Sequence, residues 1–488
     1  MLFNSFSFVI FFPTVTILYF LIPHKYRWSL LLTASCVFYM AFIPIYILVL
    51  ALTIVIDYAA ALFIEKAEGK KRKRFLIVSI VSTCSVLFVF KYFNFFNANL
   101  SQLAHFLHWN YSVGSLSLIL PIGLSFHTFQ SLSYVIEVYR GNYKAEHHFG
   151  IYALYVMFYP QLVAGPIERP GNLIHQFYEE HTYDDQRVMN GLKLMVWGFF
   201  KKVVIADRLT ILVDQIYSNP TQYTGVPLIA AVLFFPVQAY CDFSGYSDIA
   251  IGAAQVMGFR LVDNFNKPFF YSTSTADVWR RWHMSLMSWF RDYVYIPLGG
   301  NRKGKWRWYF NIFFTFALSG LWHGSKWGVI FWGALNGFYI IFSIWTQDLR
   351  KRFVHWIGLD RFPAFHKGLQ ATITFLLFCI GATLFRAESL SDAYYVVTHL
   401  GTGLGSATGI QISFKSLYSL TLNKFELIVA LVSIGFMEFI QKIEKQKDMR
   451  HLLSEKPIWI RWPIYYILLL FLIFFGEYND QAFIYFQF

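Results

Sequence analysis

Apolar stretches, each close to the length that crosses a bilayer, recur along the whole chain between short polar segments. A helix needs ~20 apolar residues to cross the hydrocarbon core of a membrane. The pattern therefore predicts an all-α polytopic integral membrane protein with about eleven transmembrane helices, some short enough to be re-entrant. The predicted stretches are Phe6–Ile22, Trp28–Phe42, Tyr46–Ile64, Phe75–Phe90, Leu116–Val138, Pro227–Tyr240, Phe310–Leu321, Trp327–Ile344, Leu369–Leu384, Leu427–Ile440 and Pro463–Phe475.

The segments between these stretches suggest how the chain is organised. The first stretch lacks a preceding basic region and a small-residue cleavage site, so we expect a retained helix and not a signal peptide. No repeat and no long polar linker divides the chain, which predicts a single membrane domain over residues 1–488. The segment Gly401–Asn423 is rich in Gly, Ser and Thr and is predicted to form an extramembrane loop.

The middle of the chain, from Phe158 to Gly324, interrupts the apolar pattern with polar and aromatic residues. Irregular or polar backbone persists at membrane depth only where it is buried in protein or lines a wet cavity. A simple anchor needs no such region. The interrupted middle therefore predicts a funnel or tunnel, surrounded by spanning helices together with short re-entrant or interfacial ones.

One segment of this middle region, Ser274–Arg291, has helical periodicity. Ser274 and Asp277 have the spacing of an N-terminal capping box. A run of aromatic and apolar side chains then recurs at helical intervals, which predicts one continuous helix. These side chains are Trp279, Trp282, His283, Leu286, Met287 and Phe290. Since the segment also carries several arginines, we expect it to lie at the membrane interface or to dip into the protein.

Composition and charge narrow the class of protein. The chain is 56% hydrophobic and 14% charged, whereas soluble proteins contain roughly 25% charged residues. The net charge of +13 comes from basic residues in short loops, such as Lys66–Arg74 and Asn301–Arg307. This is the pattern of cytoplasmic loops and not of a nucleic-acid-binding surface. Three apolar stretches precede Lys66–Arg74, so the N-terminus is expected on the extracytoplasmic side.

Histidine is the residue type best suited to proton transfer here, because burial keeps its imidazole neutral. His323 ends an apolar stretch between Gly320 and Gly324, which we expect to leave room for a substrate beside the ring. A base and a histidine that merely bonds a backbone carbonyl are equally compatible with this position. His283 and His127, taken alone, are more typical of structural residues.

Several common catalytic motifs are missing from the sequence. It contains no HExxH, no GxSxG and no EF-hand loop, and Trp306 follows a GGNRKGK segment where a phosphate-binding loop would need Ser or Thr. The four cysteines show no CxxC spacing. We therefore expect no metal site and no tightly bound cofactor.

Six ordered blocks make the chain similar to a known family. It resembles the membrane-bound O-acyltransferase superfamily, in the bacterial branch typified by alginate O-acetyltransferase. The blocks are PIGLSFHTFQSLSYVIEVYRG (Pro121–Gly141), YPQLVAGPIERP (Tyr159–Pro170), YCDFSGYSDIAIG (Tyr240–Gly252), FNKPFFYSTSTADVWRRWHMSLMSWFRDYVYIPLGGNR (Phe265–Arg302), SGLWHG (Ser319–Gly324) and LFRAESL (Leu384–Leu390).

The resemblance implies a location, a site and a reaction. It places the chain in the bacterial cytoplasmic membrane, where His323 would be the catalytic histidine and His283 the second signature residue of a tunnel. An acyl thioester, such as acetyl-CoA or an acyl carrier protein, would enter from the cytoplasm, and the acceptor would be a cell-envelope polysaccharide such as an alginate-like polymer or peptidoglycan. The expected partner is an extracytoplasmic SGNH-hydrolase-like acetyltransferase. The residues considered for lining the tunnel or positioning the donor are Trp282, Asn301, Arg302 and Trp322.

Two points remain open at this stage. The final residues, FIYFQF, resemble an aromatic motif with a central tyrosine in envelope-acylation systems, so Tyr485 is either an acyl relay or part of an interfacial anchor. The alternatives to polysaccharide acetylation are D-alanyl transfer to teichoic acid and a lipid or polymer transporter. The intact YIPLGGNR of Tyr295–Arg302 favours the acetyltransferase branch, and the lack of two related halves disfavours a transporter.

Overall fold

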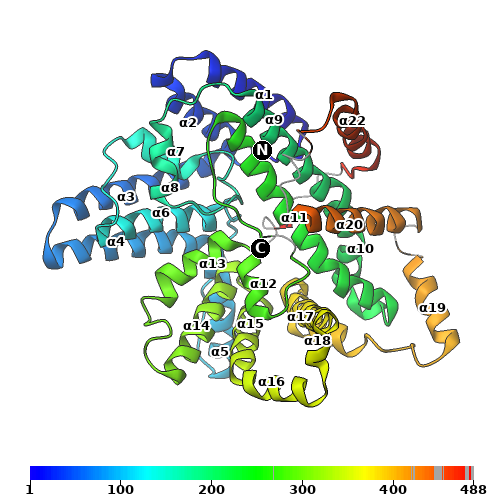
Figure 1. Cartoon of the computed structure of the whole chain (residues 1–488). Coiled ribbons are helices and arrows are strands. Elements are labelled where there is room, and N and C mark those ends of the chain that lie inside the picture. The colour runs from blue at the N-terminus through cyan, green and yellow to red at the C-terminus, as the bar shows by residue number, and fades with distance from the viewer. Residues whose placement is uncertain are drawn as a thin grey trace. The chain divides into compact units, whose positions relative to one another are not determined.

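The computed structural model describes residues 1–266, 269–418, 420, 424–444, 453, 455–478 and 483–484. All regular secondary structure in these residues is helical, as the sequence predicts. The chain forms two compact units, whose helices are labelled in Figure 1. The first comprises Met1–Met195 and Tyr246–Val262, and the second comprises Val196–Gly245 and Asp263–Ile484. Helices α9 (Asp185–Phe199) and α11 (Val226–Met257) pass from one unit into the other.

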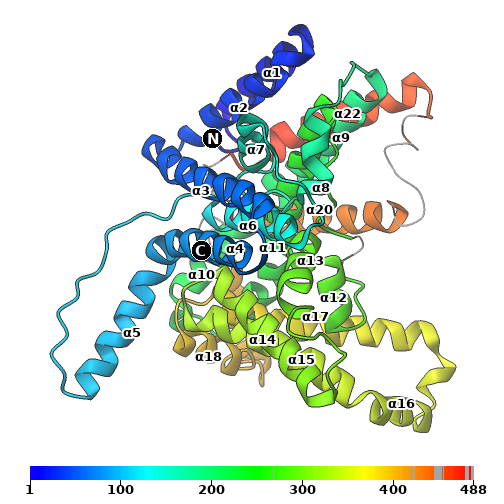
Figure 2. The same cartoon turned by 90° about the vertical axis from the view of Figure 1, so that its left-hand side faces the viewer.

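The first unit contains a group of three packed helices, α3, α4 and α6, which lie side by side in Figures 1 and 2. The carboxylate of buried Asp57 on α3 joins them, because it accepts hydrogen bonds from Ser79 (2.7 Å) and Ser131 (2.6 Å) on the other two helices. The elements of this unit are α1 (Phe6–Leu21), α2 (His24–Met40), η1 (Pro44–Tyr46), α3 (Ile47–Lys66), α4 (Gly69–Leu87), η2 (Phe88–Tyr92), α5 (Phe93–Phe106), α6 (Leu124–Arg140), α7 (Phe149–Met157), α8 (Pro170–Leu173) and η3 (Ile174–Phe177).

The second unit is built around long helices joined by short ones. Its elements are η4 (Phe200–Ala206), α10 (Asp207–Ser218), η5 (Pro220–Gln222), α12 (Thr275–Arg281), α13 (Met284–Phe290), η6 (Arg291–Tyr295), α14 (Lys305–His323), α15 (Trp327–Trp345), α16 (Gln347–Trp356), η7 (Leu359–Arg361), α17 (Pro363–Arg386), α18 (Leu390–Thr398), α19 (Ala407–Tyr418), α20 (Lys424–Glu444) and α22 (Ile458–Phe475). Helices α14 and α15 pack along each other in both views (Figures 1 and 2).

Six helical segments within the described residues are long and apolar enough to cross a membrane. They are Pro44–Lys66, Gly69–Phe106, Val226–Met257, Trp327–Trp345, Pro363–Arg386 and Ile458–Phe475. The expected count of about eleven spans is therefore not confirmed. One reason is that α6 has only 17 residues and carries His127, Gln130 and several serines along its length.

Three predicted segments differ in the structure. Residues 116–123 precede α6 without helical structure, since Pro121 and the positive φ of Gly123 (77°) end the extended segment before the helix begins. The Pro227–Tyr240 stretch continues as α11 to Met257, because its polar residues Gln238 and Asp242 are buried against protein partners and not exposed to lipid. The predicted loop Gly401–Asn423 contains a helix, α19.

The irregular backbone expected in the middle of the chain is present. Residues 158–169 form no long helix and are almost entirely buried. The carboxylate of Glu168 satisfies two neighbouring donors, the Asn172 amide (2.6 Å) and the Val262 N–H (2.6 Å). This agrees with the rule that irregular backbone at such depth must have its polar groups bonded inside the protein.

Candidate active site

The predicted helix over Ser274–Arg291 begins at its predicted capping residue, but it is divided into two shorter helices. The Ser274 hydroxyl caps α12 by accepting the Asp277 N–H at 3.1 Å. Helix α12 then ends at Arg281, Trp282 is extended, and α13 starts at Met284. The prediction of one continuous helix was therefore wrong, and the break falls on His283.

His283 has a left-handed backbone conformation, with φ 46° and ψ 51°. A residue with a Cβ costs roughly 1–2 kcal/mol in this region. The adjoining loop offsets this cost, because the Asn264 carbonyl oxygen accepts the Met284 N–H at 2.9 Å. The long-range contact with Asn264, and not the local sequence, thus explains why the helix stops.

The side chain of Asn264 orients the imidazole of His283. Its Oδ1 atom lies 3.0 Å from His283 Nδ1 and also accepts the Ser285 hydroxyl (2.9 Å) and the Ser285 N–H (3.3 Å). An oxygen that accepts at this position requires Nδ1 to carry the proton. In the neutral ring, Nε2 is then the basic nitrogen.

Burial also keeps this imidazole neutral. His283 has 0% exposed surface, and this burial, followed by the proximity of His323, lowers the pKa of His283 well below its usual range. Desolvation penalises the charged form of a histidine. The ring is therefore neutral at physiological pH, which is the protonation state that a proton acceptor or a fixed hydrogen-bonding group requires.

His323 is the last residue of α14 and is 5% exposed. Its ring is surrounded by aromatic rings that meet it edge to face: Trp322 at 4.9 Å, Trp332 at 5.1 Å and Phe385 at 5.8 Å between centroids. These neighbours come from α14, α15 and α17, so the ring is held where three helices meet in the second unit.

The two histidines lie together although 40 positions separate their numbers. Their ring centroids are 6.5 Å apart, and His283 also contacts Trp322 at 6.3 Å and Phe243 of α11 at 4.6 Å. At this separation both imidazoles belong to one buried cluster. The pair and its aromatic surroundings form the candidate active site.

The glycines beside His323 serve helix packing and do not simply leave room beside the ring. A Cβ on Gly320 would lie 2.7 Å from the Val329 carbonyl oxygen and 3.1 Å from Gly333 Cα. A Cβ on Gly324 would lie 3.3 Å from the Val329 side chain. Both glycines therefore let α14 approach α15 closely, which fixes where the end of α14 carries His323.

The other predicted site residues divide into two groups. Trp282 and Trp322 are buried beside the histidines, and Trp282 packs against Phe265 at 5.3 Å. Asn301 and Arg302 are exposed in the turn that precedes α14. Since α14 has 19 residues and a helix rises ~1.5 Å per residue, these two residues lie at the end of α14 opposite to His323.

Two further predicted positions lie elsewhere. His127 is buried within α6 of the first unit. Tyr485 lies outside the described residues, although its neighbours Phe483 and Ile484 are described and buried.

Asn264 is the site residue that the sequence reasoning missed. It stands one position before the similarity block that begins at Phe265 and 19 positions before His283. The local sequence shows only an asparagine in a polar interruption of the apolar pattern, and this does not identify its partner.

Comparison with known proteins places the site in context. Residues 144–380, which include both histidines and Asn264, match the membrane-bound O-acyltransferase family. The chain is 39% identical to the probable alginate O-acetylase of Pseudomonas aeruginosa over 88% of this chain and 82% of that protein. It is 31% identical to the peptidoglycan O-acetyltransferase of Helicobacter pylori over 75% and 72% of the two chains. Identity to the teichoic acid D-alanyltransferase of Bacillus subtilis is 28%, over 56% and 70%.

Proposed function

This chain belongs to the membrane-bound O-acyltransferase family, and from that premise we propose that it transfers acetyl groups from a thioester to hydroxyls of a cell-envelope polysaccharide. It is a multi-pass membrane acyltransferase, which rules out the transporter alternative. Relatives named for O-acetylation match 88% and 75% of the chain, whereas the D-alanyltransferase of Bacillus subtilis matches 56%. This difference in coverage is the observation that carries the choice of acetyl over D-alanyl transfer.

His323 is the proposed general base. An alcohol is a weak nucleophile at neutral pH, so a base must take its proton as the oxygen attacks the thioester carbonyl. The new C–O bond forms, the C–S bond breaks, and the proton taken by His323 passes to the departing thiolate. A positioned base of this kind contributes roughly 10²–10⁴ in rate.

His283 is proposed to fix the reacting groups. Because Asn264 holds the proton on Nδ1, the other nitrogen, Nε2, is an acceptor. It would accept a hydrogen bond from a donor group next to the attacking hydroxyl, and so hold that hydroxyl beside His323. The surrounding tryptophans, Trp282 and Trp322, exclude water from the reacting thioester. A dry site limits loss of the acyl group to hydrolysis.

The remaining features of the proposal concern the two sides of the membrane. We place the chain in the bacterial cytoplasmic membrane with its N-terminus outside and Lys66–Arg74 in the cytoplasm. Arg302 would then lie in a cytoplasmic loop, where ordinary loop charge is a more typical explanation for it than attraction of an anionic donor such as acetyl-CoA or an acyl carrier protein. Tyr485 would receive the acetyl group and pass it to an extracytoplasmic SGNH-hydrolase-like transferase.

The test uses the purified chain in lipid nanodiscs with acetyl-CoA labelled in the acetyl group. In nanodiscs, His323→Ala is expected to abolish transfer of label to the protein, while its melting temperature stays near that of the wild type. In cells, the same substitution is expected to abolish acetylation of the polymer. Tyr485→Phe removes one oxygen and is expected to block outward transfer alone. Acetate content at the wild-type level in the His323→Ala strain would refute the base assignment.

D-alanyl transfer is tested in the same preparation. A D-alanyl carrier protein replaces acetyl-CoA as the labelled donor, and the two rates are compared at equal thioester concentration. Faster labelling from the D-alanyl donor would overturn the choice of acetyl group and would leave membership of the family untouched.

A further inference from the structure

Helix α16, Gln347–Trp356, has an apolar face that is exposed along its whole length. Leu349, Phe353 and Trp356 are spaced four and three residues apart, so they lie on one side of the helix. They are 64%, 57% and 80% exposed, and no residue of α16 is buried against the described part of the chain. In both views α16 lies at the edge of the second unit (Figures 1 and 2). An exposed apolar face of this kind marks a surface for lipid or for a partner protein.

The neighbours of α16 along the chain put it at a membrane surface. Helices α15 and α17 are each long and apolar enough to cross a membrane, and the residues between them, 346–362, contain α16. The two helices pack at the ends that lie away from α16, where the rings of Trp332 and Phe385 are 5.0 Å apart. The connection between two consecutive spanning helices emerges on one side of the bilayer. Helix α16 therefore belongs to the boundary between hydrocarbon and water.

The rest of the α16 surface is basic. Successive residues of a helix are turned by ~100°, so Lys351 lies opposite the apolar face and Arg352 lies beside it. Both side chains are exposed, and neither is paired with a carboxylate among the described residues. The connection between α15 and α17 also contains two acidic residues, Asp348 and Asp360. Asp360 is paired with His355 at 2.7 Å, and the overall charge of the connection stays positive.

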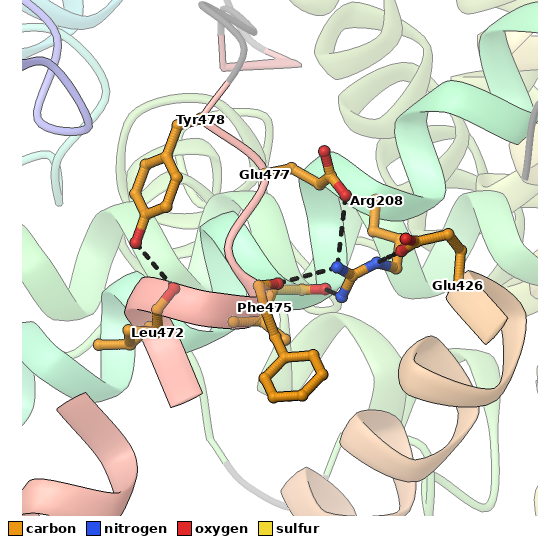
Figure 3. A network of polar contacts seen from close by, with 7 residues as sticks. Arg208, Glu426, Leu472, Phe475, Glu477 and Tyr478 are labelled. Atoms are coloured by element: carbon orange, nitrogen blue, oxygen red, sulfur yellow. Dashed lines mark hydrogen bonds and ion pairs between the residues drawn. The ribbon is translucent and has the colours of Figure 1, made fainter. Parts of the chain in front are cut away.

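A buried arginine of the same unit shows the contrast. Arg208, 3% exposed, donates to the Phe475 carbonyl oxygen at the end of α22 at 2.9 Å (Figure 3). Its guanidinium also lies 3.3 Å from the Glu477 carboxylate and 2.6 Å from that of Glu426 on α20. The charge of Arg208 is therefore balanced inside the protein, where it holds the residues after α22. The two basic side chains of α16 have no carboxylate partner in the described part of the chain, so they are available to an anionic group outside it.

A second basic segment, Asn301–Arg307, lies at the same end of α15 as α16. Helix α14 runs antiparallel to α15, since a Cβ on Gly320 would lie 2.7 Å from the Val329 carbonyl oxygen and one on Gly337 would lie 3.2 Å from Phe313 Cα. The first turn of α14 and the last turn of α15 are therefore neighbours. The segment contains four Lys or Arg residues and no acidic residue. Two basic segments thus meet at one end of this helix pair.

Three exposed tryptophans mark the same end. Trp306 in the first turn of α14, Trp345 at the end of α15 and Trp356 at the end of α16 are 84%, 64% and 80% exposed. At ~1.5 Å per residue, Trp306 and Trp345 both lie about 10–12 Å beyond the contact between Phe313 and Gly337. Tryptophan is enriched where a membrane meets water, because its ring is apolar and its N–H is polar. Tryptophans at one level beside basic segments are typical of the bilayer boundary.

We propose that α16 lies flat in the membrane interface and is a binding site for the headgroups of anionic phospholipids. Its apolar face enters the acyl boundary to a depth of ~5–10 Å, and the long side chains of Lys351 and Arg352 reach the phosphates. The excess of basic residues assigns this surface to the cytoplasmic leaflet, whose anionic lipids attract such segments. An acidic carrier protein would also be attracted by the charges, but the shared level of the tryptophans favours lipid. The inference does not depend on the proposed acetyl transfer.

The test uses the full chain in nanodiscs of phosphatidylcholine that contain a small fraction of phosphatidylglycerol. Bromine, which quenches tryptophan emission at short range, is placed high on the acyl chains of one lipid or of the other. The emission of Trp356 is obtained as the difference between the wild type and Trp356→Phe, which keeps an aromatic side chain on the apolar face. We expect bromine on either lipid to quench this emission. We expect brominated phosphatidylglycerol to quench it more than its share of the lipid predicts.

A charge variant tests the recognition of the headgroup. It combines Lys351→Gln with Arg352→Gln, and its matched control combines Lys351→Arg with Arg352→Lys and keeps both charges. Each Lys or Arg near an anionic surface contributes a factor of about five to binding. The excess quenching by brominated phosphatidylglycerol is therefore expected to fall several-fold in the charge variant and to persist in the control. The melting temperature in phosphatidylcholine alone is expected to stay near that of the wild type, because the substituted side chains have no carboxylate partner among the described residues.

Each outcome decides one part of the proposal. If neither brominated lipid quenches the Trp356 emission, α16 does not lie in the interface, and its face is then open to an acidic carrier protein. Quenching in proportion to lipid composition, or excess quenching that survives in the charge variant, overturns the recognition of anionic headgroups. An equal loss in the control shows that charge is not the cause. All of these results leave the proposed acetyl transfer untouched, because no variant changes the histidine pair or its neighbours.

Discussion

Replacing Asn264 with alanine tests whether the loop before α12 controls the chemistry of His283. The substitution removes one oxygen that accepts from His283 Nδ1, the Ser285 hydroxyl and the Ser285 N–H at 3.0, 2.9 and 3.3 Å. Each buried donor left without an acceptor costs roughly 1–3 kcal/mol. The backbone bond from Met284 to the Asn264 carbonyl oxygen survives in the variant. The chain is therefore expected to fold with reduced stability.

The expected effect on rate follows from the lost orientation of the ring. Without the acceptor, His283 can exchange tautomers and rotate, so Nε2 no longer presents a fixed lone pair. For histidines that bind metal ions, loss of the orienting partner costs ~10–100-fold in activity. A loss of the same size here corresponds to about 1.4–2.7 kcal/mol in the barrier. We expect a drop of this size in the turnover of acetyl-CoA by Asn264→Ala, with a smaller change in KM.

Asn264→Asp is the matched control because it keeps an accepting oxygen at the same position. A carboxylate there also favours the protonated imidazole, so the pKa of His283 is expected to rise and the acidic limb of the pH–rate profile to move to higher pH. Turnover is measured from thiol release between pH 5 and 9, together with melting temperature. Full turnover in Asn264→Ala, or an unmoved profile in Asn264→Asp, would show that the hydrogen bond has no part in the reaction.

Three further predictions concern pH, packing and tethering. Because the pKa of folded His283 is depressed, the unfolded state takes up the proton first, and stability is lost as pH falls below ~6.5 by up to ~1.4 kcal/mol per unit. The His283→Asn variant should lose less stability than the wild type between pH 7 and 5, and equal losses in the two proteins would refute this. Gly333→Ala places a Cβ 2.8 Å from Gly320 Cα and should separate α14 from α15, lowering both stability and turnover. Gly435→Ala, whose Cβ meets nothing within 4 Å, is its neutral control. Arg208→Met should cost about 2–3 kcal/mol by calorimetry, less than a fully buried pair because its carboxylates are partly solvated. An unchanged melting temperature would show that Arg208 does not stabilise the attachment of the residues after α22.

Hydropathy was a reliable guide where a helix faces an apolar environment on most sides. The stretch Trp327–Ile344 corresponds to α15, Trp327–Trp345, and Leu369–Leu384 lies within α17, Pro363–Arg386. Hydropathy did not predict helix bounds where polar residues are paired inside the protein. The predicted stretch ending at Tyr240 stops short because Asp242 interrupts the apolar run, and nothing in the local sequence reveals its partner Lys202, 40 positions earlier.

In the candidate site, too, features set by local sequence were predicted and features set by long-range contacts were not. His283 and His323 were identified by resemblance, and the Ser274 cap was identified by its local spacing. Their proximity depends on the contact between α14 and α15 and on Asn264, which are properties of the folded chain. Gly320 illustrates the limit, since a small residue beside a histidine fits a substrate path as well as a helix contact until the position of Val329 is known.

The break at His283 is what allows one short segment to serve two sets of partners. In an unbroken helix, residues four positions apart such as Trp279 and His283 would project from the same face. The left-handed residue redirects the chain between them. Trp279 donates to Asn336 of α15 at 3.2 Å, whereas His283 contacts Phe243 of α11 and lies beside His323. The strain at one residue thus lets α12 anchor on α15 while α13 begins at the histidine pair. A residue held in a sparsely populated conformation by long-range bonds is typical of a functional site, and here those bonds come from Asn264.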